Sequence, residues 1–524
     1  MGSSRTEFSF TRTVITALAL LLGISACSDN KDSTTASKPQ PDNPVVTGPI
    51  SGGGAADCCM LNFSGFIVDL RMVGYTPGTP FYAGLSYDEA EVGYLETEYF
   101  LSGTAKSYIG TDEFGSDGKW PVQAADTADY ITRIVVQRPI DPAAFNGVAV
   151  VEWFNVSGGV DSPPAWLQAH TELVREGYVW VGVSAQRAGV EGGGAFDLPV
   201  KTIDPERYGE LNHPGDSFSY DIFSQAAQAV RNPQGMDPLG GLNVTTMIAT
   251  GQSQSASRLI TYINAVHPTI ELFDGFIVHG RGSGSSSLSQ EPQLSVATPR
   301  PAYIRGDMPQ PVITLQAETD VLRGGAVTFR QDDSDVFRLW EVAGSAHTDL
   351  YTTIRSQEDR GDDPTIADVL SKNDARPPFI TCAIPVNDGP AHWVTAAAIS
   401  QLKTWIHSNS PAPAADRLAL TADGSAYDLD AYGNVKGGVR TPYVDAPVAT
   451  LSGLGQPPAD AFCGLLGTTA LFDAATLATL YPTNADYIND IDTATDAAVE
   501  QGFLRPADGD LIKARARTSG IGGL

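Results

Sequence analysis

Residues 245–260 read Thr-Thr-Met-Ile-Ala-Thr-Gly-Gln-Ser-Gln-Ser-Ala-Ser-Arg-Leu-Ile, and the rest of the chain is best understood from this stretch. Its first half predicts a buried strand, and apolar residues then recur with helical spacing up to Val266. Between strand and helix lies Gly251-x-Ser253-x-Ser255. Small residues on either side of a serine let strand and helix approach at a tight turn that presents a nucleophile. The common motif ends in glycine, so Ser255 is a departure, and a turn without chemistry is the alternative.

Apolar strands alternate with helices on both sides of this stretch. Nearly all-apolar runs of this kind are typical of parallel strands that are buried on both faces. Five such strands are predicted, at 147–155, 178–183, 272–278, 311–315 and 336–342. Two earlier runs, at 94–105 and 131–139, alternate between apolar and polar residues and predict antiparallel strands. The pattern favours an α/β fold with a doubly wound, mostly parallel sheet.

The carboxyl ends of the later strands carry the residues that a serine nucleophile needs. In doubly wound sheets the chemistry lies past these ends, and the partners of Ser253 should follow in the order acid, then histidine. Asp320 follows the predicted strand 311–315 and His347 follows 336–342, so we predict a catalytic triad of Ser253, Asp320 and His347. Two alternatives stay open. Glu318 could be the acid, and His392, before the last long helix, could be the base.

A serine hydrolase also needs preorganised donors for the oxyanion of its tetrahedral intermediate. One is expected from the backbone N–H of Gln254, directly after the nucleophile. The other is expected from the turn after the strand 147–155, where we assign it to the backbone of Asn155 or Val156. The alternative for this glycine-rich turn is a flexible connection. The run 279–282, His-Gly-Arg-Gly, resembles an oxyanion motif but follows the wrong strand.

The amino terminus has the pattern of an export signal. Residues 1–26 combine early arginines with a short apolar run, which predicts a signal peptide. The run ends Ile-Ser-Ala before Cys27, which resembles a lipoprotein cleavage box with Cys27 as the lipidated residue; an ordinary secretory cleavage near Ala26 is the alternative. Residues 27–56 are rich in Ser, Thr, Pro and Gly and predict a flexible tether. We therefore expect an exported, lipid-anchored envelope protein or, failing that, a periplasmic or secreted one.

Composition excludes several classes of partner. The chain has 524 residues, 42% of them hydrophobic, and a formal net charge of −28. Such acidity opposes binding to nucleic acid or to anionic lipid, so contact with a membrane is expected only through the lipid anchor. No spacing of Cys or His suggests a metal site, and no organic cofactor is indicated. The acidic loops 331–335 and 359–363 could hold calcium, but solvated charge is the simpler interpretation.

The remaining cysteines permit disulfide bonds in an exported protein. With Cys27 assigned to lipid, Cys58, Cys59, Cys382 and Cys463 are left, and their pairing stays open. The adjacent Cys58 and Cys59 would need a strained ring to bridge each other. At least one of them, if bonded, is expected to reach a distant cysteine.

Several stretches together carry a family resemblance, namely 98–105, 152–158, 180–186, 251–255 and 340–347. With them the chain resembles a bacterial family of secreted "alpha/beta hydrolase domain-containing" proteins within the α/β-hydrolase superfamily, over about residues 90–520. The resemblance implies the α/β-hydrolase fold. It also places Ser253 and His347 on the nucleophile and the base of that family.

The predicted organisation is one catalytic domain over residues 57–524. The segments 187–216 and 281–310 are candidate lids, and 409–524 are expected to form an arm that wraps the core. The predicted function is an exported serine hydrolase that cleaves carboxylic esters, with a small-molecule or lipid-like ester as substrate. The alternative is a surface lipoprotein that uses the same fold only to bind a ligand.

Overall fold

The computed structural model describes residues 44–48, 60–63, 66–69, 79–193, 198–368, 382–457 and 462–523. The predicted signal peptide and Cys27 lie outside these residues, as do Cys58 and Cys59. Within the described ranges, no helix has the length and apolar character needed to cross a membrane.

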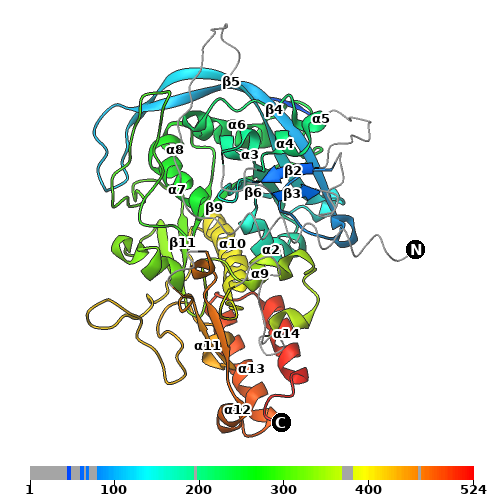
Figure 1. Cartoon of the computed structure of the whole chain (residues 1–524), viewed down its shortest axis with the longest axis vertical. Coiled ribbons are helices and arrows are strands. Elements are labelled where there is room, and N and C mark those ends of the chain that lie inside the picture. Colours follow the sequence, from blue (N-terminus) through cyan, green and yellow to red (C-terminus); the bar gives the residue numbers. More distant parts are fainter. Residues whose placement is uncertain are drawn as a thin grey trace. The chain divides into compact units, whose positions relative to one another are not determined.

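Within the described residues, a ten-stranded sheet has the strand order β12-β11-β10-β9-β6-β7-β5-β4-β1-β8. Figure 1 labels β4, β5, β6, β9 and β11 of this sheet. Its strands are β1 (Val45–Thr47), β4 (Tyr94–Gly110), β5 (Val122–Pro139), β6 (Val148–Trp153), β7 (Val179–Val183), β8 (Gln234–Gly235), β9 (Thr246–Gln252), β10 (Gly275–His279), β11 (Val312–Ala317) and β12 (Phe337–Val342). β6 runs parallel to both β7 and β9, and β11 runs parallel to β12. β4 and β5 form a long antiparallel pair. The predicted α/β class with a mostly parallel sheet is confirmed.

The polypeptide divides into two compact units. Of the described residues, the first contains those up to 166 and those within 176–276 and 284–310. It contains α3 (Arg187–Glu191), α4 (Val200–Ile203), α5 (Pro205–Tyr208), α6 (Ser219–Arg231), α7 (Gln254–Thr261) and α8 (His267–Ile270). Every residue of β6, β7 and β9 is buried, as their apolar sequences require.

The predicted tether and one predicted lid of this unit contain regular structure. β1 lies within the predicted tether 27–56, and its residues pair antiparallel with those of β4. The predicted lid 187–216 contains the short helices α3, α4 and α5, which bury apolar side chains such as Val190, Val200 and Tyr208 in a common cluster. The apolar residues of this segment therefore form part of the core.

The second unit contains the described residues within 167–175, 277–283 and 311–524. Its helices are α9 (Leu350–Thr353), α10 (Ala391–Ser408), α11 (Pro442–Asp445), α12 (Ala474–Leu480), α13 (Asn484–Glu500) and α14 (Pro506–Thr518), and α2 (Pro164–Arg175) belongs to it for most of its length. A small antiparallel pair, β13 (Ala449–Ser452) and β14 (Thr468–Leu471), belongs to the same unit, and β2 (Met60–Phe63) pairs with β3 (Phe66–Asp69) elsewhere.

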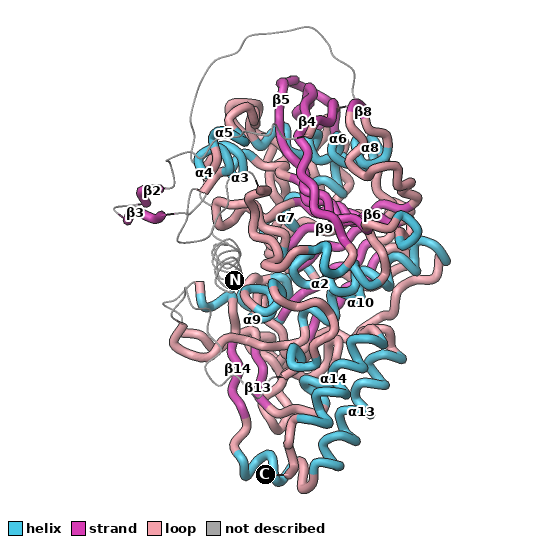
Figure 2. Tube along the Cα trace, turned by 90° about the vertical axis from the view of Figure 1, so that its right-hand side faces the viewer, coloured by secondary structure: helices cyan, strands magenta, loops and turns pink. Residues whose placement is uncertain are grey.

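The carboxyl-terminal residues build a core of their own. α13 and α14 lie side by side (Figure 2). Their apolar residues, including Ile491 and Ile512, cluster with Leu451 and Trp393. A disulfide between Cys382 and Cys463 closes this region. The predicted arm 409–524 thus supplies much of the packed interior of the second unit.

Candidate active site

Ser253 occupies a strained turn between β9 and α7. Its backbone has φ 62° and ψ −117°, a conformation that a residue with a side chain rarely adopts. Holding a non-glycine residue there costs on the order of 1–3 kcal/mol, so the surrounding structure must enforce it. α7 begins with the next residue, Gln254. The turn has the geometry of the nucleophile elbow that the motif predicts.

The two small residues around Ser253 make this turn possible. A Cβ atom on Gly251 would lie 2.9 Å from the carbonyl oxygen of Ser255, which is too close for any side chain. Ser255 is fully buried, and its Oγ donates to the carbonyl oxygen of Gln252 at 2.8 Å. The hydroxyl of Ser255 thus binds the backbone of the same turn.

The loop after β6 contains the candidate oxyanion donors. The N–H of Asn155 donates to the carbonyl oxygen of Ser162 at 2.9 Å, so Asn155 does not offer the predicted backbone donor. Among the residues that the structure describes, none accepts a hydrogen bond from the N–H of Val156. The N–H of Gln254 stands at the first position of α7, where a helix has no acceptor for it. Val156 and Gln254 are the two predicted donors that remain.

Glu152, on β6, is a buried carboxylate that the sequence analysis overlooked. It accepts the N–H groups of Ala165 and Trp166 at 2.8 and 2.9 Å, at the start of α2, and the indole N–H of Trp180 at 3.0 Å. Burial nevertheless raises its pKa to about 8, against the opposing effect of these donors. The sequence signal for Glu152 is an acidic residue inside an otherwise apolar strand, shortly before a Pro-Pro pair that starts a helix.

Asp320 and His347 lie in contact within the second unit. Asp320 Oδ1 is 2.5 Å from His347 Nδ1, and both side chains are buried. The other carboxylate oxygen, Oδ2, accepts the N–H of Ala317 at 2.7 Å. An Nδ1–H held by a carboxylate leaves Nε2 as the basic nitrogen of the ring. The acid and base predicted from strand order are therefore brought together.

A glycine allows this pair to approach the end of β10. Gly280 has φ +61°, and a Cβ atom placed on it would lie 3.3 Å from His347 Nδ1 and 3.5 Å from Asp320 Oδ2. The backbone of the His-Gly-Arg-Gly run thus packs directly against the pair. Beside it, burial lowers the pKa of His279 to about 4, so this imidazole is neutral near pH 7.

Glu318 does not lie where an acid partner of His347 is needed. It is fully buried and accepts the N–H groups of Gly344 at 2.7 Å and Gly453 at 2.8 Å. Burial raises its pKa to about 7. Its neighbour Thr319 donates to the carbonyl oxygen of Gly453 and accepts the N–H of His347. Glu318 and Thr319 therefore hold the loop that carries His347.

His392, the alternative base, lies in the first turn of α10 and is buried. Its ring stacks on Tyr351 with the centroids 3.6 Å apart. Neither ring nitrogen has a hydrogen-bond partner in the described part of the chain, and burial holds its pKa well below the usual value. Without a carboxylate to orient it, this histidine lacks what Asp320 gives His347.

The residues that the structure describes contain no group of three or more His, Cys, Asp or Glu side chains placed to hold a metal ion. In the two acidic loops, Asp333 accepts from Arg417 at 2.8 Å and Asp359 accepts from Tyr351 at 2.8 Å. These carboxylates are engaged with the protein itself.

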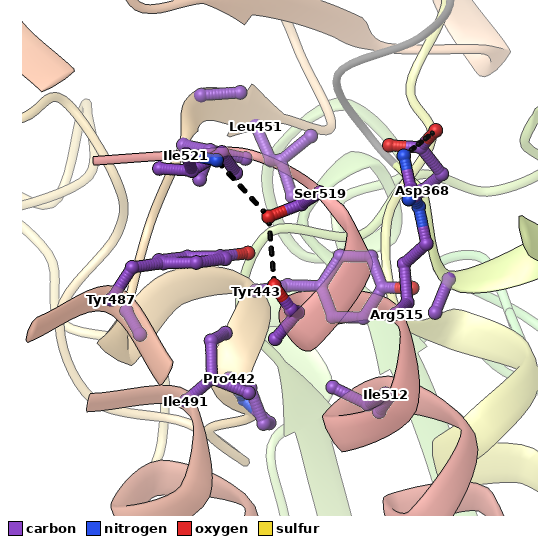
Figure 3. Close-up of a pocket in the computed structure, with 15 residues that line it drawn as sticks. Asp368, Pro442, Tyr443, Leu451, Tyr487, Ile491, Ile512, Arg515, Ser519 and Ile521 are labelled. Carbon is purple, nitrogen blue, oxygen red and sulfur yellow. Dashed lines mark hydrogen bonds and ion pairs between the residues drawn. The ribbon is translucent and has the colours of Figure 1, made fainter. Parts of the chain in front are cut away.

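A pocket in the second unit lies among β13, α11, α13 and α14 (Figure 3). The empty space at this pocket is about 480 Å³ when the open solvent at its mouth is counted. Apolar side chains such as Leu451 and Ile491 line it with Tyr443 and Tyr487, beside an ion pair of Asp368 and Arg515 (Figure 3). None of the predicted site residues lines it.

A serine elbow after a parallel strand, with an acid and a histidine after later strands, is the arrangement of an α/β hydrolase. The sequence matches the family described as alpha/beta hydrolase domain over residues 46–514, and the chain belongs to this family. A search of curated proteins gave no match.

The solved structures that the chain matches have low sequence identity and low TM-scores. A proposed dienelactone hydrolase from Klebsiella pneumoniae subsp. pneumoniae is 13% identical, with a TM-score of 0.22, 46% of this chain covered and 85% of the other. The serine hydrolase XC6422 from Xanthomonas campestris is 15% identical, with a TM-score of 0.24 and coverages of 40% and 78%. Est1E from Butyrivibrio proteoclasticus, with ferulic acid bound, is 10% identical, with a TM-score of 0.24 and coverages of 40% and 85%.

Proposed function

We propose that this protein is an exported serine hydrolase that cleaves carboxylic esters, with Ser253 as nucleophile, His347 as general base and Asp320 as the acid that orients His347. The observation that carries the proposal is the backbone of Ser253, at φ 62° and ψ −117° between β9 and α7. Strained residues of this kind cluster at active sites, and a serine on such a turn presents its hydroxyl for reaction. The contact of Asp320 with His347 supports the second half of the triad.

The reaction follows from these groups. His347 Nε2 takes the proton of the Ser253 hydroxyl as the oxygen attacks the ester carbonyl, and the N–H groups of Val156 and Gln254 bind the resulting oxyanion. The protonated imidazole then gives its proton to the leaving alcohol as the carbon–oxygen bond breaks. Water, deprotonated by His347, attacks the acyl-serine, and the acid product leaves with Ser253 restored. The mechanism requires His347 Nε2 to reach Ser253 Oγ.

We further propose that the protein acts outside the cytoplasm, held at a membrane by lipid on Cys27. The sequence pattern of residues 1–27 motivates this part. Replacing Cys27 by Ser should release the protein from the membrane fraction, as measured by fractionation and by the loss of metabolic labelling with a fatty acid. Continued labelling of the Cys27→Ser variant would contradict the assignment.

The function is tested by release of p-nitrophenol from short and medium acyl esters by the purified full chain. We expect turnover by the wild type and its loss in Ser253→Ala, together with fluorophosphonate labelling that the same substitution abolishes. Absence of both turnover and labelling in a folded wild-type protein would favour the ligand-binding alternative. Turnover that survives in His347→Ala but is lost in His392→Ala would move the base to His392.

A further inference from the structure

Asn155 makes hydrogen bonds in two directions at the end of β6. Its Nδ2 donates to the carbonyl oxygen of Gln252 at 2.9 Å, and its Oδ1 accepts the N–H of Ser157 at 2.8 Å. Its backbone N–H and C=O both pair with Ser162, at 2.9 and 3.0 Å. The side chain is 3% exposed, so water does not compete for these bonds. All four hydrogen-bonding groups of this residue are thus committed inside the protein.

The two side-chain bonds end next to the two remaining oxyanion donors. Gln252 precedes Ser253 and lies two residues before Gln254, while Ser157 directly follows Val156. One planar carboxamide therefore joins the turn that carries Gln254 to the loop that carries Val156. The strands that precede the loop and the turn are also aligned with each other, because β6 pairs in parallel with β9. Beyond the ends of these strands, the carboxamide of Asn155 continues the connection.

The far end of the same loop is held by a buried charge network. Asp161 accepts from Arg133 Nη2 at 2.7 Å and also from the hydroxyl of Ser184. The carbonyl oxygen of Asp161 accepts the N–H of Ala83 at 3.0 Å. Arg133 is fully buried and also pairs with Glu98 at 2.7 Å. Asp161 is held by this network, and the next residue, Ser162, pairs through its backbone with Asn155.

We propose that Asn155 is a positioning residue, whose carboxamide sets the spacing between the N–H groups of Val156 and Gln254 in the oxyanion hole. The inference rests on the proposed function, since it concerns the transition state of that reaction. Donors of this kind act only when they lie at hydrogen-bond distance from the developing oxyanion. A displacement of about 1 Å in an active site can cost about 100-fold in rate. Loss of the carboxamide should therefore act on kcat more than on KM.

The chain provides a matched control at the other end of β6. Asn146 Nδ2 donates to the carbonyl oxygen of Glu176 at 2.8 Å, and its Oδ1 accepts the N–H of Val148 at 2.9 Å. Asn146→Ala thus removes the same kinds of hydrogen bond as Asn155→Ala, far along the strand from the elbow. Both substitutions should lower the stability of the protein. Only Asn155→Ala should also weaken binding of the transition state.

The experiment compares wild type, Asn155→Ala, Asn155→Asp and Asn146→Ala in the full chain, with a p-nitrophenyl ester as substrate and an alkyl trifluoromethyl ketone as tetrahedral mimic. Asn155→Asp keeps the shape and the acceptor for Ser157 but turns the donor toward Gln252 into an oxygen. We expect both Asn155 variants to lose about 10- to 100-fold in kcat and in affinity for the ketone, with KM changed less than about threefold. Asn146→Ala should keep wild-type kcat.

Each other outcome overturns the inference. A kcat within about threefold of wild type in a folded Asn155 variant would mean that the carboxamide does not set the donors. An equal loss of kcat in Asn146→Ala would mean that the effect is one of stability alone. If Asn155→Ala does not fold, Asn155→Asp decides by the same measurement. Absence of turnover and of Ser253 labelling in the wild type is a distinct result, which removes the proposed function and the inference with it.

Discussion

The elbow around Ser253 and the pair of Asp320 with His347 are built in contrasting ways. At the elbow, the contacts that shape the backbone around Ser253 join residues close in sequence, such as Gly251 with Ser255 and Ser255 with Gln252, and the bond from Asn155 reaches this turn from 97 residues away. The acid–base pair instead joins segments 27 residues apart, and its supports reach from Thr319 to Gly453, 134 residues away. Local strain presents the proposed nucleophile, whereas distant parts of the chain hold the proposed base.

The elbow and the acid–base pair should therefore respond differently to substitution. A local turn keeps its conformation as long as β9 and α7 form, so changes of side chain there should affect chemistry before stability. A group held by distant segments depends on the packing of all of them. Substitutions around His347 should therefore couple activity to stability, and those at Ser253 should separate the two.

Ser253 gives the largest expected effect and the sharpest test of this separation. Both Ser253→Ala and Ser253→Gly should lower kcat by about 10⁴- to 10⁶-fold, because each removes the nucleophile. Only glycine tolerates φ 62° without strain, so Ser253→Gly should also raise the free energy of unfolding, by about 1 kcal/mol relative to Ser253→Ala. Ester turnover and urea denaturation measure the two effects. Equal stability of the two variants would mean that the elbow stores no strain.

Asp320→Asn is expected to have the next largest effect. The amide can keep a hydrogen bond to His347, but it stabilises neither the Nδ1–H tautomer nor the imidazolium formed during attack. We expect kcat to fall by about 10⁴-fold with KM little changed, as measured by steady-state turnover at pH 7. Glu318→Gln serves as the control, because Glu318 binds Gly344 and Gly453 instead of His347. A larger loss in the control than in Asp320→Asn would make Glu318 the catalytic acid.

The sequence predicted the parts that depend on local pattern and on strand order. The buried strands, the elbow and the position of Asp320 and His347 after β11 and β12 all follow from periodicity and from the rule that sites lie past strand ends. The role of the Asn155 side chain could not be predicted in this way. It depends on a contact with Gln252, 97 residues away, that only the completed sheet creates.

The choice between the two acidic residues also depends on contacts that only the folded chain creates. Glu318 and Asp320 are two residues apart, and nothing in their spacing tells which carboxylate meets His347. The choice is made by Gly453, whose N–H engages Glu318 from the carboxyl-terminal region, and by Ala317, whose N–H fixes Asp320. Many apolar residues of the predicted arm 409–524 pack with one another, and short-range periodicity does not reveal such contacts.

Gly280→Ala should produce an intermediate effect on the acid–base side. The new methyl group would press on His347 and Asp320 and would also occupy a left-handed backbone position. We expect a fall of about 10- to 100-fold in kcat and a loss of about 1–3 kcal/mol in the free energy of unfolding. Gly424→Ala is the matched control, because Gly424 has φ +70° with nothing within 4 Å of a new Cβ atom. A loss of kcat as large in the control would show that backbone strain alone is responsible.

The smallest effect on catalysis is expected from Glu318→Gln, which should keep kcat within about tenfold but change how stability depends on pH. Burial raises the pKa of Glu318 to about 7 from an ordinary value of 4.5, so the folded chain retains a proton that the unfolded chain has released. The contribution of Glu318 to stability is therefore greatest below pH 4.5 and is lost as the pH rises toward 7. Glutamine does not titrate.

The free energy of unfolding of the wild type, minus that of Glu318→Gln, should accordingly fall between pH 5 and pH 8, by at most about 2–3 kcal/mol. Urea denaturation at a series of pH values measures this difference, and subtraction removes the titration of all other groups. A difference that stays constant, or rises with pH, would mean that the N–H groups of Gly344 and Gly453 hold the carboxylate ionised in the folded chain. The loop that carries His347 would then be held by a charged carboxylate. The hydrogen bonds from the two N–H groups would outweigh the effect of burial on the pKa of Glu318.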